Sequence, residues 1–403
     1  MKKKNVVIIG INYYPEDTAI GLYTTQKAKH LAENGYNVQI ITGFPYYPQW
    51  EIWSEYKNKS RWTKEESHGI TIFRFKQYVP SNPTFSKRIL HLLSFTLGSM
   101  INLLKVSRPE IVITIVPFTS SILLGYMLKL RYRSKLWVHI QDFEFDAAVD
   151  SGLLDSNKSK ALKLLLYIEK TLLKKADVIS TISNSMLKKL KEKTNRNGWY
   201  LTNWLDTEIF EKNHEQHHYL KSTNFKILYS GNIGKKQDWE FFLDFLQKIQ
   251  EIENVEVIVV GQGALKEDVL EKTKSFDFVK HFDPVPFEEL PKLLSSADLH
   301  ILFQKDGVVD TVMPSKILGM MGSARPSIIT GNIESEVGKI VMESQGGFYF
   351  QSNQMNEIIE TVNELKNNPK RCEELGKNAK HYVIHNYGKD KVLNGFLSKL
   401  NTL

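Results

Sequence analysis

Two runs of alternating strand-like and helix-like segments constrain the fold of this chain more than any other feature. In each run, short apolar segments rich in valine and isoleucine alternate with longer segments whose apolar residues recur at helical spacing. Parallel strands need crossover connections of this length, so each run predicts a parallel sheet covered by helices. A polar stretch over residues 203–224 separates the runs. We therefore expect an α/β protein with two doubly wound, Rossmann-like domains facing across a cleft.

The expected domains span residues 1–205 and 206–385, and a C-terminal helix over about 386–403 is expected to pack back on the first. A chain of 403 residues is too long for one ordinary core, and with 42% apolar residues it can fill two. The expected strands are 5–11, 38–42, 70–75, 110–116, 135–141 and 177–180 in the first domain, and 225–231, 255–260, 279–282, 298–303, 327–330 and 347–350 in the second. The segment 43–62, rich in Pro, Tyr and Trp, predicts a mobile surface loop.

Cysteine and histidine usage limits the chemistry that the chain can hold. Its single cysteine, Cys372, excludes a disulfide framework and a cysteine-based zinc site, which favours a reducing compartment such as the cytoplasm. His214, His217 and His218 form a histidine tract, but no cysteine or carboxylate spacing accompanies it. We interpret this tract as solvated and expect no metal and no cofactor.

Positive charge is concentrated in the first half of the chain. Residues 1–200 carry 30 lysines and arginines against 16 acidic residues, a net charge of +14, whereas residues 201–403 carry 23 against 29, a net charge of −6. Basic residues flank apolar helical segments at 85–106 and 158–175, and no nucleic-acid motif is present. This pattern favours an anionic membrane surface as a partner, with solvated helix faces as the alternative. No segment reaches the roughly 20 uninterrupted apolar residues of a membrane span.

The segment 310–326, DTVMPSKILGMMGSARP, predicts a helix that starts beside a cation. Pro314 suits the first helical position, Ser315 can cap the helix, and Lys316 adds a positive charge. Backbone N–H groups at such a helix start suit a phosphate or diphosphate. An ordinary capped helix with a solvated lysine is the alternative that these residues leave open.

Two further turns of the second half also suit a phosphate. YSGNIGKKQ, residues 229–237, places two glycines and two lysines between a strand and a helix. Gly261 and Gly263 follow the next strand, although a short glycine pair is by itself a weak signal. Three such turns in one domain favour a phosphate-binding site over three unrelated connections.

Titratable side chains gather at one strand end of the first half. His139, Asp142, Glu144 and Asp146 lie within eight residues after or at the end of the strand 135–141. Their spacing predicts an acid–base role or contact with sugar hydroxyls, with structural roles as the alternative. The loop after the first strand lacks G-x-G-x-x-G spacing, but Gly21 would let its backbone approach a substrate.

Taken together, these motifs resemble glycosyltransferase family 4, which has the GT-B fold, and most closely its colanic-acid fucosyltransferase-like branch. The resemblance covers essentially the whole chain. The segments that carry it are NYYPEDTAIGLYT, LAENGYNVQIITGFPYYP, HIQDFEFDAA, YSGNIGKKQ, VVGQGALKEDV, FEELPKLLSSADLHIL and VVDTVMPSKILGMMGSARPSI. It implies transfer of a sugar from a nucleotide diphosphate sugar with retention of anomeric configuration and without an obligatory metal.

The resemblance also implies roles for individual residues. Catalytic or charge-stabilising roles fall on His139, Asp142, Lys236 and Lys316. Donor contacts fall on Gly231, Asn232, Lys235, Gly261, Gly263, Met313, Pro314, Ser315 and Ile317, with the Pro284–Val285 turn holding the base. The acceptor side is expected to include Tyr14, Glu16, Gly21 and Glu144.

Two positions depart from the common pattern of the family. Thr311 and Gly319 stand where many members carry a Glu-x7-Glu pair, and Asn232 stands where an arginine is common. The first departure changes how sugar and ribose hydroxyls are held, and the second removes one diphosphate contact. Both departures also occur in the colanic-acid-like branch that the chain resembles.

The function that the resemblance implies is a transferase of bacterial surface polysaccharide assembly at the inner membrane face. A GDP-sugar such as GDP-fucose is the favoured donor, a UDP-sugar is next, and the acceptor is a polyprenyl-diphosphate-linked sugar or a glycan. Two alternatives stay open, namely a nucleotide-sugar epimerase of GT-B fold and a non-catalytic sugar-nucleotide-binding protein.

Overall fold

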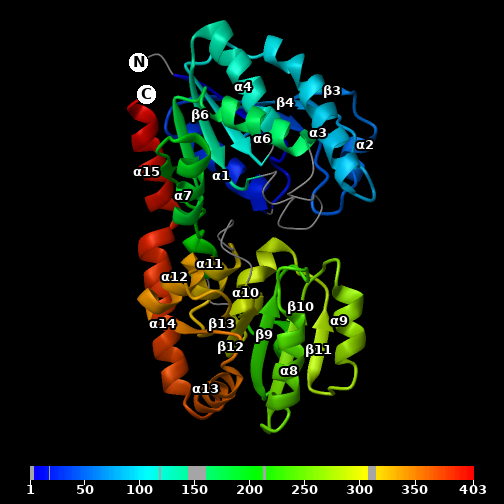
Figure 1. The fold of residues 1–403 in the computed structure, drawn as a ribbon, viewed down its shortest axis with the longest axis vertical. Coiled ribbons are helices and arrows are strands. Elements are labelled where there is room, and N and C mark those ends of the chain that lie inside the picture. The colour runs from blue at the N-terminus through cyan, green and yellow to red at the C-terminus, as the bar shows by residue number, and fades with distance from the viewer. Residues whose placement is uncertain (1–3, 18, 118, 144–159, 212–214, 307–314) are drawn as a thin grey trace. The chain divides into compact units, whose positions relative to one another are not determined.

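The computed structural model describes residues 4–17, 19–117, 119–143, 160–211, 215–306 and 315–403 (Figure 1). The chain divides into two compact units. Unit 1 comprises Met1–Thr202 and Leu393–Leu403, and unit 2 comprises Asn203–Val392. Each unit has its own sheet and its own buried core.

Unit 1 is built on an eight-stranded sheet with the order β3-β4-β2-β1-β5-β6-β7-β8. Its strands are β1 (Asn5–Ile9), β2 (Asn37–Gly43), β3 (Trp62–Ser67), β4 (Ile70–Phe75), β5 (Ile111–Val116), β6 (Lys135–Ile140), β7 (Val178–Thr181) and β8 (Trp199–Tyr200). All neighbouring strands are parallel except β3, which pairs antiparallel with β4 at the edge. The central strands β1 and β5 are almost wholly buried, as expected for parallel strands covered by helices on both faces.

The helices of unit 1 connect these strands. They are α1 (Ala19–Glu33), α2 (Ser54–Lys57), α3 (Phe85–Met100), the 3-10 turn η1 (Asn102–Leu104), α4 (Thr119–Tyr132), α6 (Lys160–Leu173), α7 (Asn184–Thr194) and α15 (Lys389–Asn401). The strand order reverses between β1 and β5, so right-handed crossovers place α1 on one face and α3, α4 and α6 on the other. From Leu393 onward α15 belongs to unit 1, where the Phe396 ring lies 5.1 Å from the Trp137 ring.

Unit 2 is built on a fully parallel six-stranded sheet with the order β11-β10-β9-β12-β13-β14. Its strands are β9 (Phe225–Ser230), β10 (Val255–Val260), β11 (Val279–Phe282), β12 (Leu299–Phe303), β13 (Ser327–Thr330) and β14 (Gly347–Phe350). Its helices are η2 (Thr207–Phe210), η3 (His218–Leu220), α8 (Trp239–Ile249), α9 (Lys266–Thr273), η4 (Phe287–Glu289), α10 (Leu290–Ser295), α11 (Ser315–Gly322), α12 (Glu336–Ser344), α13 (Met355–Asn367) and α14 (Pro369–Tyr387).

The predicted fold class is confirmed, because each unit is a doubly wound α/β sheet. The expected strands at 279–282, 327–330 and 347–350 have the observed bounds. The edge strand β3 and the helix α12 were not predicted from the sequence. Among the described residues, no helix is long and apolar enough to span a membrane.

Two expectations about exposed segments are wrong. The segment 43–62 was expected to be a mobile surface loop, yet Phe44, Tyr46 and Tyr56 are buried in it. The histidine tract was expected to be solvated, and His218 is exposed as expected, but His217 is completely buried and its backbone N–H donates to Ser296 Oγ at 2.7 Å. His214 lies outside the described residues.

Two helical glycines of unit 1 should respond oppositely to substitution by alanine. A Cβ at Gly125 in α4 would lie 2.4 Å from Thr114 Cγ2 on the sheet, whereas a Cβ at Gly395 in α15 would meet nothing within 4 Å. We expect Gly125→Ala to lower the free energy of unfolding by about 1–3 kcal/mol, because the core is overpacked. Gly395→Ala should raise it by up to about 1 kcal/mol, because alanine favours the helix. Urea titration measures both, and equal stabilities would contradict this packing of α4.

Candidate functional site

The candidate site of unit 2 lies where its strand order reverses, between β9 and β12. In open parallel sheets, ligands bind at the carboxyl ends of the two strands beside such a reversal. The turn after β9 contains Gly231, and the connection after β12 leads to α11 with Lys316. The topology therefore brings together two segments that the sequence singled out as phosphate-binding.

The side chain of Lys316 lies on the turn after β9. Its Nζ atom donates to the Tyr229 hydroxyl oxygen at 3.0 Å and to the Asn232 carbonyl oxygen at 3.4 Å. It also lies 4.9 Å from the centre of the Tyr229 ring, within cation–π range. A Cβ at Gly231 would lie 2.3 Å from Lys316 Cε, so the absence of a side chain at this position makes room for the lysine.

The surroundings of Lys316 leave its charge poorly compensated. Burial lowers the pKa of Lys316 to about 8, and burial likewise raises the pKa of the Tyr229 hydroxyl. Since the Tyr229 hydroxyl donates to the Asn232 carbonyl oxygen at 2.6 Å, its lone pairs accept the Lys316 bond and hold the ammonium in place. No described carboxylate forms an ion pair with Lys316. A partly buried cation whose described hydrogen-bond partners are neutral oxygens suits an anionic ligand.

The glycines after β10 pack this turn against the next one. A Cβ at Gly261 would lie 2.0 Å from the Gly231 carbonyl oxygen, and one at Gly263 would lie 2.2 Å from the Ile233 carbonyl oxygen. The Ile233 N–H donates to the Gln262 carbonyl oxygen at 2.8 Å, which closes the contact. Gly263 also has a φ of +159°, which favours glycine. These glycines therefore let two backbone turns touch.

The predicted base-binding turn follows β11 at the same edge of the sheet. Pro284 is exposed and Val285 is half-buried. The preceding residue, Asp283, accepts hydrogen bonds from Gln262 Nε2 at 2.7 Å and from Lys266 Nζ at 2.6 Å. The base-side turn is thus tied to the glycine turn after β10.

The remaining donor-side residues of unit 2 have different positions. Lys235 and Lys236 are exposed on the turn between β9 and α8. Ile317 has its side chain in the core, so only its backbone can face a ligand at the first turn of α11, which starts at Ser315. Gly319 lies one turn further along α11. Thr311, Met313 and Pro314 lie outside the described residues.

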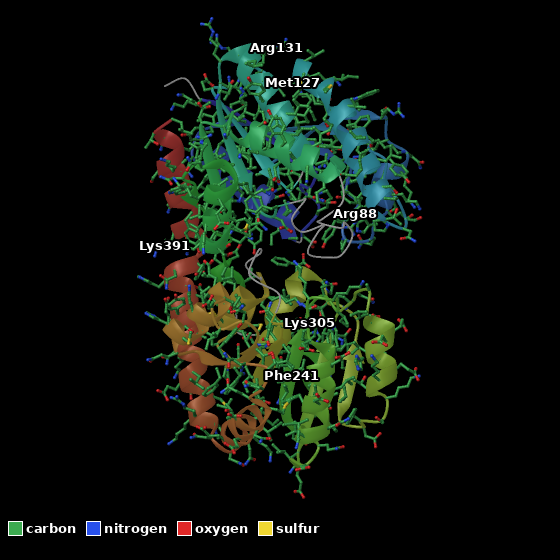
Figure 2. All side chains as sticks on the ribbon, in the orientation of Figure 1. Arg88, Met127, Arg131, Phe241, Lys305 and Lys391 are labelled. Atoms are coloured by element: carbon green, nitrogen blue, oxygen red, sulfur yellow. The ribbon has the colours of Figure 1, made fainter. Side chains whose placement is uncertain are left out.

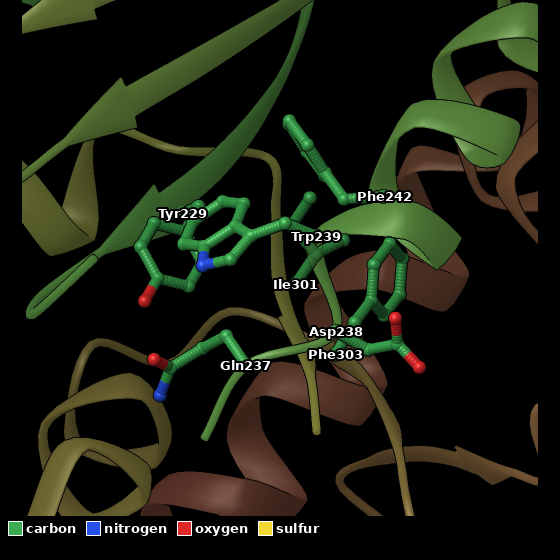
Figure 3. A pocket seen from close by; sticks show the side chains of 7 residues that line it. All are labelled: Tyr229, Gln237, Asp238, Trp239, Phe242, Ile301 and Phe303. Atoms are coloured by element: carbon green, nitrogen blue, oxygen red, sulfur yellow. The ribbon is translucent and has the colours of Figure 1, made fainter. Parts of the chain in front are cut away.

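A small cavity lies behind Tyr229 (Figure 3). Its volume is about 10 Å³, room for about one water molecule. The Tyr229 ring contacts the Trp239 ring edge-to-face at 5.0 Å beside it. A larger hollow of about 310 Å³ lies in unit 1 near Asn37 and Gly69, at the amino ends of β2 and β4, away from the edge where ligands of α/β sheets bind.

Of the four titratable residues predicted at the end of β6, His139 and Asp142 lie at its carboxyl end, and Asp146 lies outside the described residues. His139 is buried, its Nδ1 contacts Ser180 Oγ at 2.9 Å, and Gln141 Nε2 donates to its Nε2 at 3.0 Å. Burial, together with the charge of Lys27, holds the pKa of His139 well below its usual range. The neutral ring therefore orients Gln141, the residue before the half-buried Asp142. Contact of His139 or Asp142 with substrate stays a prediction, and Glu144 lies outside the described residues.

Glu16 connects two loops at the carboxyl ends of β1 and β2. Its Oε1 accepts hydrogen bonds from the backbone N–H groups of Tyr46 and Tyr47, both at 2.8 Å, and its Oε2 accepts one from Asn12 Nδ2 at 2.9 Å. The side chain is buried, and burial raises the pKa of Glu16 despite these bonds. The contacts give Glu16 a bracing role, while its predicted acceptor contact stays untested.

Gly21 and Tyr14 belong to the same loop region. A Cβ at Gly21 would lie 2.6 Å from the Glu16 carbonyl oxygen, so the glycine lets α1 approach the loop. The Tyr14 ring is 41% exposed and lies 6.0 Å from the His68 ring and 5.9 Å from Lys29 Nζ. Sequence reasoning did not single out Lys27, Arg74 or Tyr229, all of which are buried polar groups at these sites.

One histidine cluster of unit 2 has the composition of a metal site. Ligand atoms of His217, His218 and Glu289 lie within 4.8 Å of one another. However, His217 Nδ1 accepts the Tyr219 N–H at 3.2 Å, and His217 Nε2 lies 3.2 Å from Glu289 Oε2. Because Nδ1 is an acceptor, Nε2 carries the proton and donates to Glu289, which satisfies the ring without a metal.

Comparisons with known proteins assign this architecture to a class. Residues 18–198 match the family model "Glycosyl transferase 4-like domain", and residues 210–382 match "Glycosyl transferases group 1". The chain is 33% identical over 353 residues to the Escherichia coli (strain K12) protein WcaI, which is named as a colanic acid biosynthesis glycosyl transferase. That match covers 83% of this chain and 85% of WcaI.

Solved structures of low sequence identity share the fold. Sucrose-phosphate synthase from Thermosynechococcus elongatus has a TM-score of 0.75 at 13% identity, with 99% of each chain covered. HepE of Anabaena, in complex with UDP-glucose, has a TM-score of 0.68 at 12% identity, covering 99% of this chain and 100% of HepE. The chain therefore belongs to the glycosyltransferases of family 4 with the GT-B fold, in the branch similar to the colanic acid enzymes.

The buried carboxyl of Glu16 should make unit 1 less stable as pH rises. Because burial raises its pKa in the folded state, the unfolded chain gives up this proton more readily, and stability falls as pH rises above 4.5, the ordinary value. Glu16→Gln should remove this contribution to the pH dependence of urea unfolding. Glu16→Ala leaves two backbone N–H groups without their acceptor and should cost about 1–3 kcal/mol at any pH. A Glu16→Gln profile identical to that of the unaltered chain would contradict this assignment.

Proposed function

We propose that this chain is a retaining, metal-independent glycosyltransferase that uses a nucleotide diphosphate sugar as donor. Membership of the family supports transfer of a sugar, and one observation carries the proposal about the donor. Lys316, a partly buried cation whose hydrogen bonds to described residues go to neutral oxygens, lies at the strand reversal of unit 2, where a diphosphate would complete its coordination.

In the proposed reaction, the bond between the anomeric carbon and the diphosphate oxygen breaks, and a bond to an acceptor hydroxyl oxygen forms on the same face. The leaving nucleoside diphosphate takes up the negative charge, and the hydroxyl proton goes to that diphosphate or to solvent. Lys316, Lys236 and the backbone N–H groups at the start of α11 would stabilise the charge in place of a metal. Gln141, which His139 orients through a hydrogen bond, and the neighbouring Asp142 are the groups of unit 1 proposed to contact sugar hydroxyls.

The donor and the acceptor are proposed from the relatives. The colanic acid name of WcaI supports a role in bacterial surface polysaccharide biosynthesis. A GDP-sugar such as GDP-fucose is proposed from the resemblance of the sequence motifs to the colanic-acid fucosyltransferase-like branch. HepE is described in complex with UDP and UDP-glucose, which supports a UDP-sugar as the next candidate. A polyprenyl-diphosphate-linked or glycan acceptor is proposed, with the chain in the cytoplasm and peripheral on the inner membrane face.

The nucleotide preference is testable by thermal shift. The unaltered chain is heated with GDP, UDP or dTDP at equal concentrations. A ligand that binds the folded state raises the melting temperature in proportion to the logarithm of its concentration over Kd. We expect GDP to give the largest shift in melting temperature. A larger shift with UDP would favour a UDP-sugar as the donor. No shift with any of the three nucleotides would overturn the proposed donor site.

Replacing Lys316 should remove most of the affinity for the diphosphate. A hydrogen bond to a charged group contributes about 1.5–3 kcal/mol, so Lys316→Ala should weaken nucleotide binding roughly tenfold to hundredfold and suppress sugar transfer. Lys248→Ala, an exposed lysine late in α8, is the matched control and should bind normally. Isothermal titration calorimetry with GDP and UDP measures the nucleotide affinity of both variants. Normal sugar transfer by Lys316→Ala would contradict the proposed site.

The affinity for nucleoside diphosphate should also fall with rising pH. Below about 8, the pKa of Lys316, the side chain is protonated before the ligand arrives. Above it, binding must take up a proton, so affinity should fall by up to about tenfold per pH unit. Titrations at pH 7 and pH 9 compare the unaltered chain with Lys316→Ala, which should lack this dependence. A parallel decline in both proteins would assign the effect to another group.

Turnover assays separate transfer from the alternatives. A transferase consumes donor at speed only with acceptor present, whereas an epimerase converts UDP-GlcNAc without one. A non-catalytic binding protein would show the thermal shift but no donor consumption in the presence of a membrane extract that contains lipid-linked acceptors.

A further inference from the structure

Three neighbouring helices of unit 1 form one layer on the sheet. The middle helix, α4, packs against both α3 and α6, and the three lie next to one another in the ribbon (Figure 1). They share the face of the sheet opposite to α1. The outward sides of these three helices and of η1 are referred to below as the α3–α4–α6 face.

The α3–α4–α6 face is apolar where a solvated face would be polar. Of the 17 large hydrophobic side chains exposed in the described chain, 11 lie on it, so they form a concentration and not a scatter. Those of α3, η1 and the residue between them are Leu90, Leu93, Leu97, Ile101 and Leu104, those of α4 are Leu123, Met127 and Leu130, and those of α6 are Leu164, Tyr167 and Ile168.

The middle helix shows the pattern most clearly. Leu123, Met127 and Leu130 recur at intervals of four and three residues, so they line one side of α4. Arg131 is the other exposed residue within this helix. Figure 2 shows Met127 and Arg131 on the same outer part of unit 1. Leu130 is 64% exposed, as much as an ordinary solvated lysine, although water is an unfavourable environment for it.

Charge on this face has one sign. The segments 85–109, 119–135 and 160–175 contain a single acidic residue, Glu169, which is buried and paired with Lys193 at 2.6 Å. Basic residues surround the apolar side chains. They are Lys87, Arg88, Lys105, Arg108, Arg131, Arg133, Lys135, Lys163, Lys170, Lys174 and Lys175, together with Lys129, which pairs with Asp177 at 2.7 Å. The combination of a cationic rim and an apolar centre complements an anionic lipid surface.

Other occupants fit this face less well. A second copy of the chain would bring two faces of the same positive charge together, which opposes self-association. An acidic protein would satisfy the charges, but the side chains that dominate the binding energy of protein interfaces are Trp, Tyr and Arg, and leucine is under-represented among them. Seven of the 11 exposed apolar side chains on this face are leucines. Leucine side chains with tyrosine and lysine around them suit the boundary between headgroups and acyl chains.

We propose that the α3–α4–α6 face inserts its apolar side chains into the headgroup boundary of an anionic bilayer while the surrounding lysines and arginines contact lipid phosphates. The proposal rests on the proposed function for the identity of the membrane, and it adds the surface and the mode of contact. Insertion of apolar side chains resists salt, whereas adsorption by charge alone is screened over about 8 Å at physiological ionic strength.

The start of α3 links this face to the loops of the predicted acceptor side. The Arg88 guanidinium lies 5.3 Å from the Trp50 ring, and the His91 ring lies 4.8 Å from the Tyr46 ring. The Tyr46 backbone in turn donates to Glu16. Within unit 1, a lipid surface on α3 would therefore lie beside the loops at the carboxyl ends of β1 and β2, where a lipid-linked acceptor is proposed to bind.

Vesicle flotation tests the surface with matched triple variants of the full chain. Leu97→Ser, Leu130→Ser and Leu164→Ser together remove one apolar side chain from each helix. The control combines Ile333→Ser, Met342→Ser and Ile384→Ser, exposed apolar positions of unit 2. We expect at least tenfold weaker binding of the first variant, and unchanged binding of the control, to phosphatidylcholine vesicles with 30% phosphatidylglycerol. Equal binding by both variants overturns the proposal.

Salt and lipid charge separate insertion from adsorption. The unaltered chain should bind these vesicles at 0.15 M NaCl and keep a measurable fraction of that binding at 0.5 M. Lys87→Glu, Arg131→Glu and Lys163→Glu together should abolish the preference for anionic over neutral vesicles. Complete loss of binding at 0.5 M NaCl, or no binding by the unaltered chain at low salt, overturns insertion.

A fluorescent probe reports insertion directly. Since the natural Cys372 is buried, a cysteine added by Leu164→Cys can be labelled selectively with an environment-sensitive dye. Its emission should shift to the blue with anionic vesicles, and the same label on Met342→Cys should not respond. A shift on dimerisation without lipid, seen together with a dimer in sedimentation, would assign the face to a second copy and overturn the proposal. Thermal shift with nucleotide should stay normal in every variant, so failure of membrane insertion is distinguishable from failure of the donor site.

Discussion

The absence of a side chain at Gly231 is the constraint on which the donor-side geometry of unit 2 depends. A Cβ there would lie 2.3 Å from Lys316 Cε, so the lysine side chain could not keep its position on the turn after β9, and a φ of +137° at Gly231 also disfavours any residue other than glycine. Glycines play the same part in the turn after β10, where Gly261 and Gly263 allow backbone contact with the turn after β9. Three loops from adjacent strands thus converge with little side-chain volume between them, and Lys316 is the cation held at their meeting point. The lack of side-chain volume would leave room for the proposed phosphate to reach backbone N–H groups.

Most of the fold could be predicted from the sequence because the strands and helices of a parallel sheet have local sequence patterns. Buried strands such as β10 are short runs of apolar residues, and the crossover helices alternate with them at regular spacing. The edge strand β3 carries polar and charged residues along Trp62–Ser67, so it lacks that signal and was not predicted. Likewise, the burial of Tyr46 and Tyr56 depends on packing against segments far away in sequence, and an irregular segment rich in aromatic residues gives no periodicity that would indicate it.

The candidate site could be predicted only where its residues have local signatures. Lys316 and the glycine turns were found because helix starts and glycine-rich connections are local features. Tyr229 was not found, since its contact with Lys316 spans 87 positions in the sequence and the residue otherwise reads as part of a buried strand. His139 illustrates the converse: both faces of β6 are covered, so alternation cannot indicate whether a polar residue faces a ligand or the core. Its buried hydrogen bonds with Ser180 and Gln141 show that the His139 ring lies in the core of unit 1, which the sequence could not indicate.

The position of α15 has a consequence for the order in which the chain is made. Phe396 is fully buried, its ring lies 5.1 Å from that of Trp137, and Lys27 Nζ lies 5.5 Å from it. Residues 393–403 complete the core of unit 1, yet they leave the ribosome after the whole of unit 2. During synthesis, the Trp137 indole and the Lys27 ammonium group of unit 1 therefore lack their contacts with Phe396 until the second sheet has been translated. Unit 2 comprises Asn203–Val392 and includes none of the residues that follow, so the second unit to be translated is the first that can complete its core.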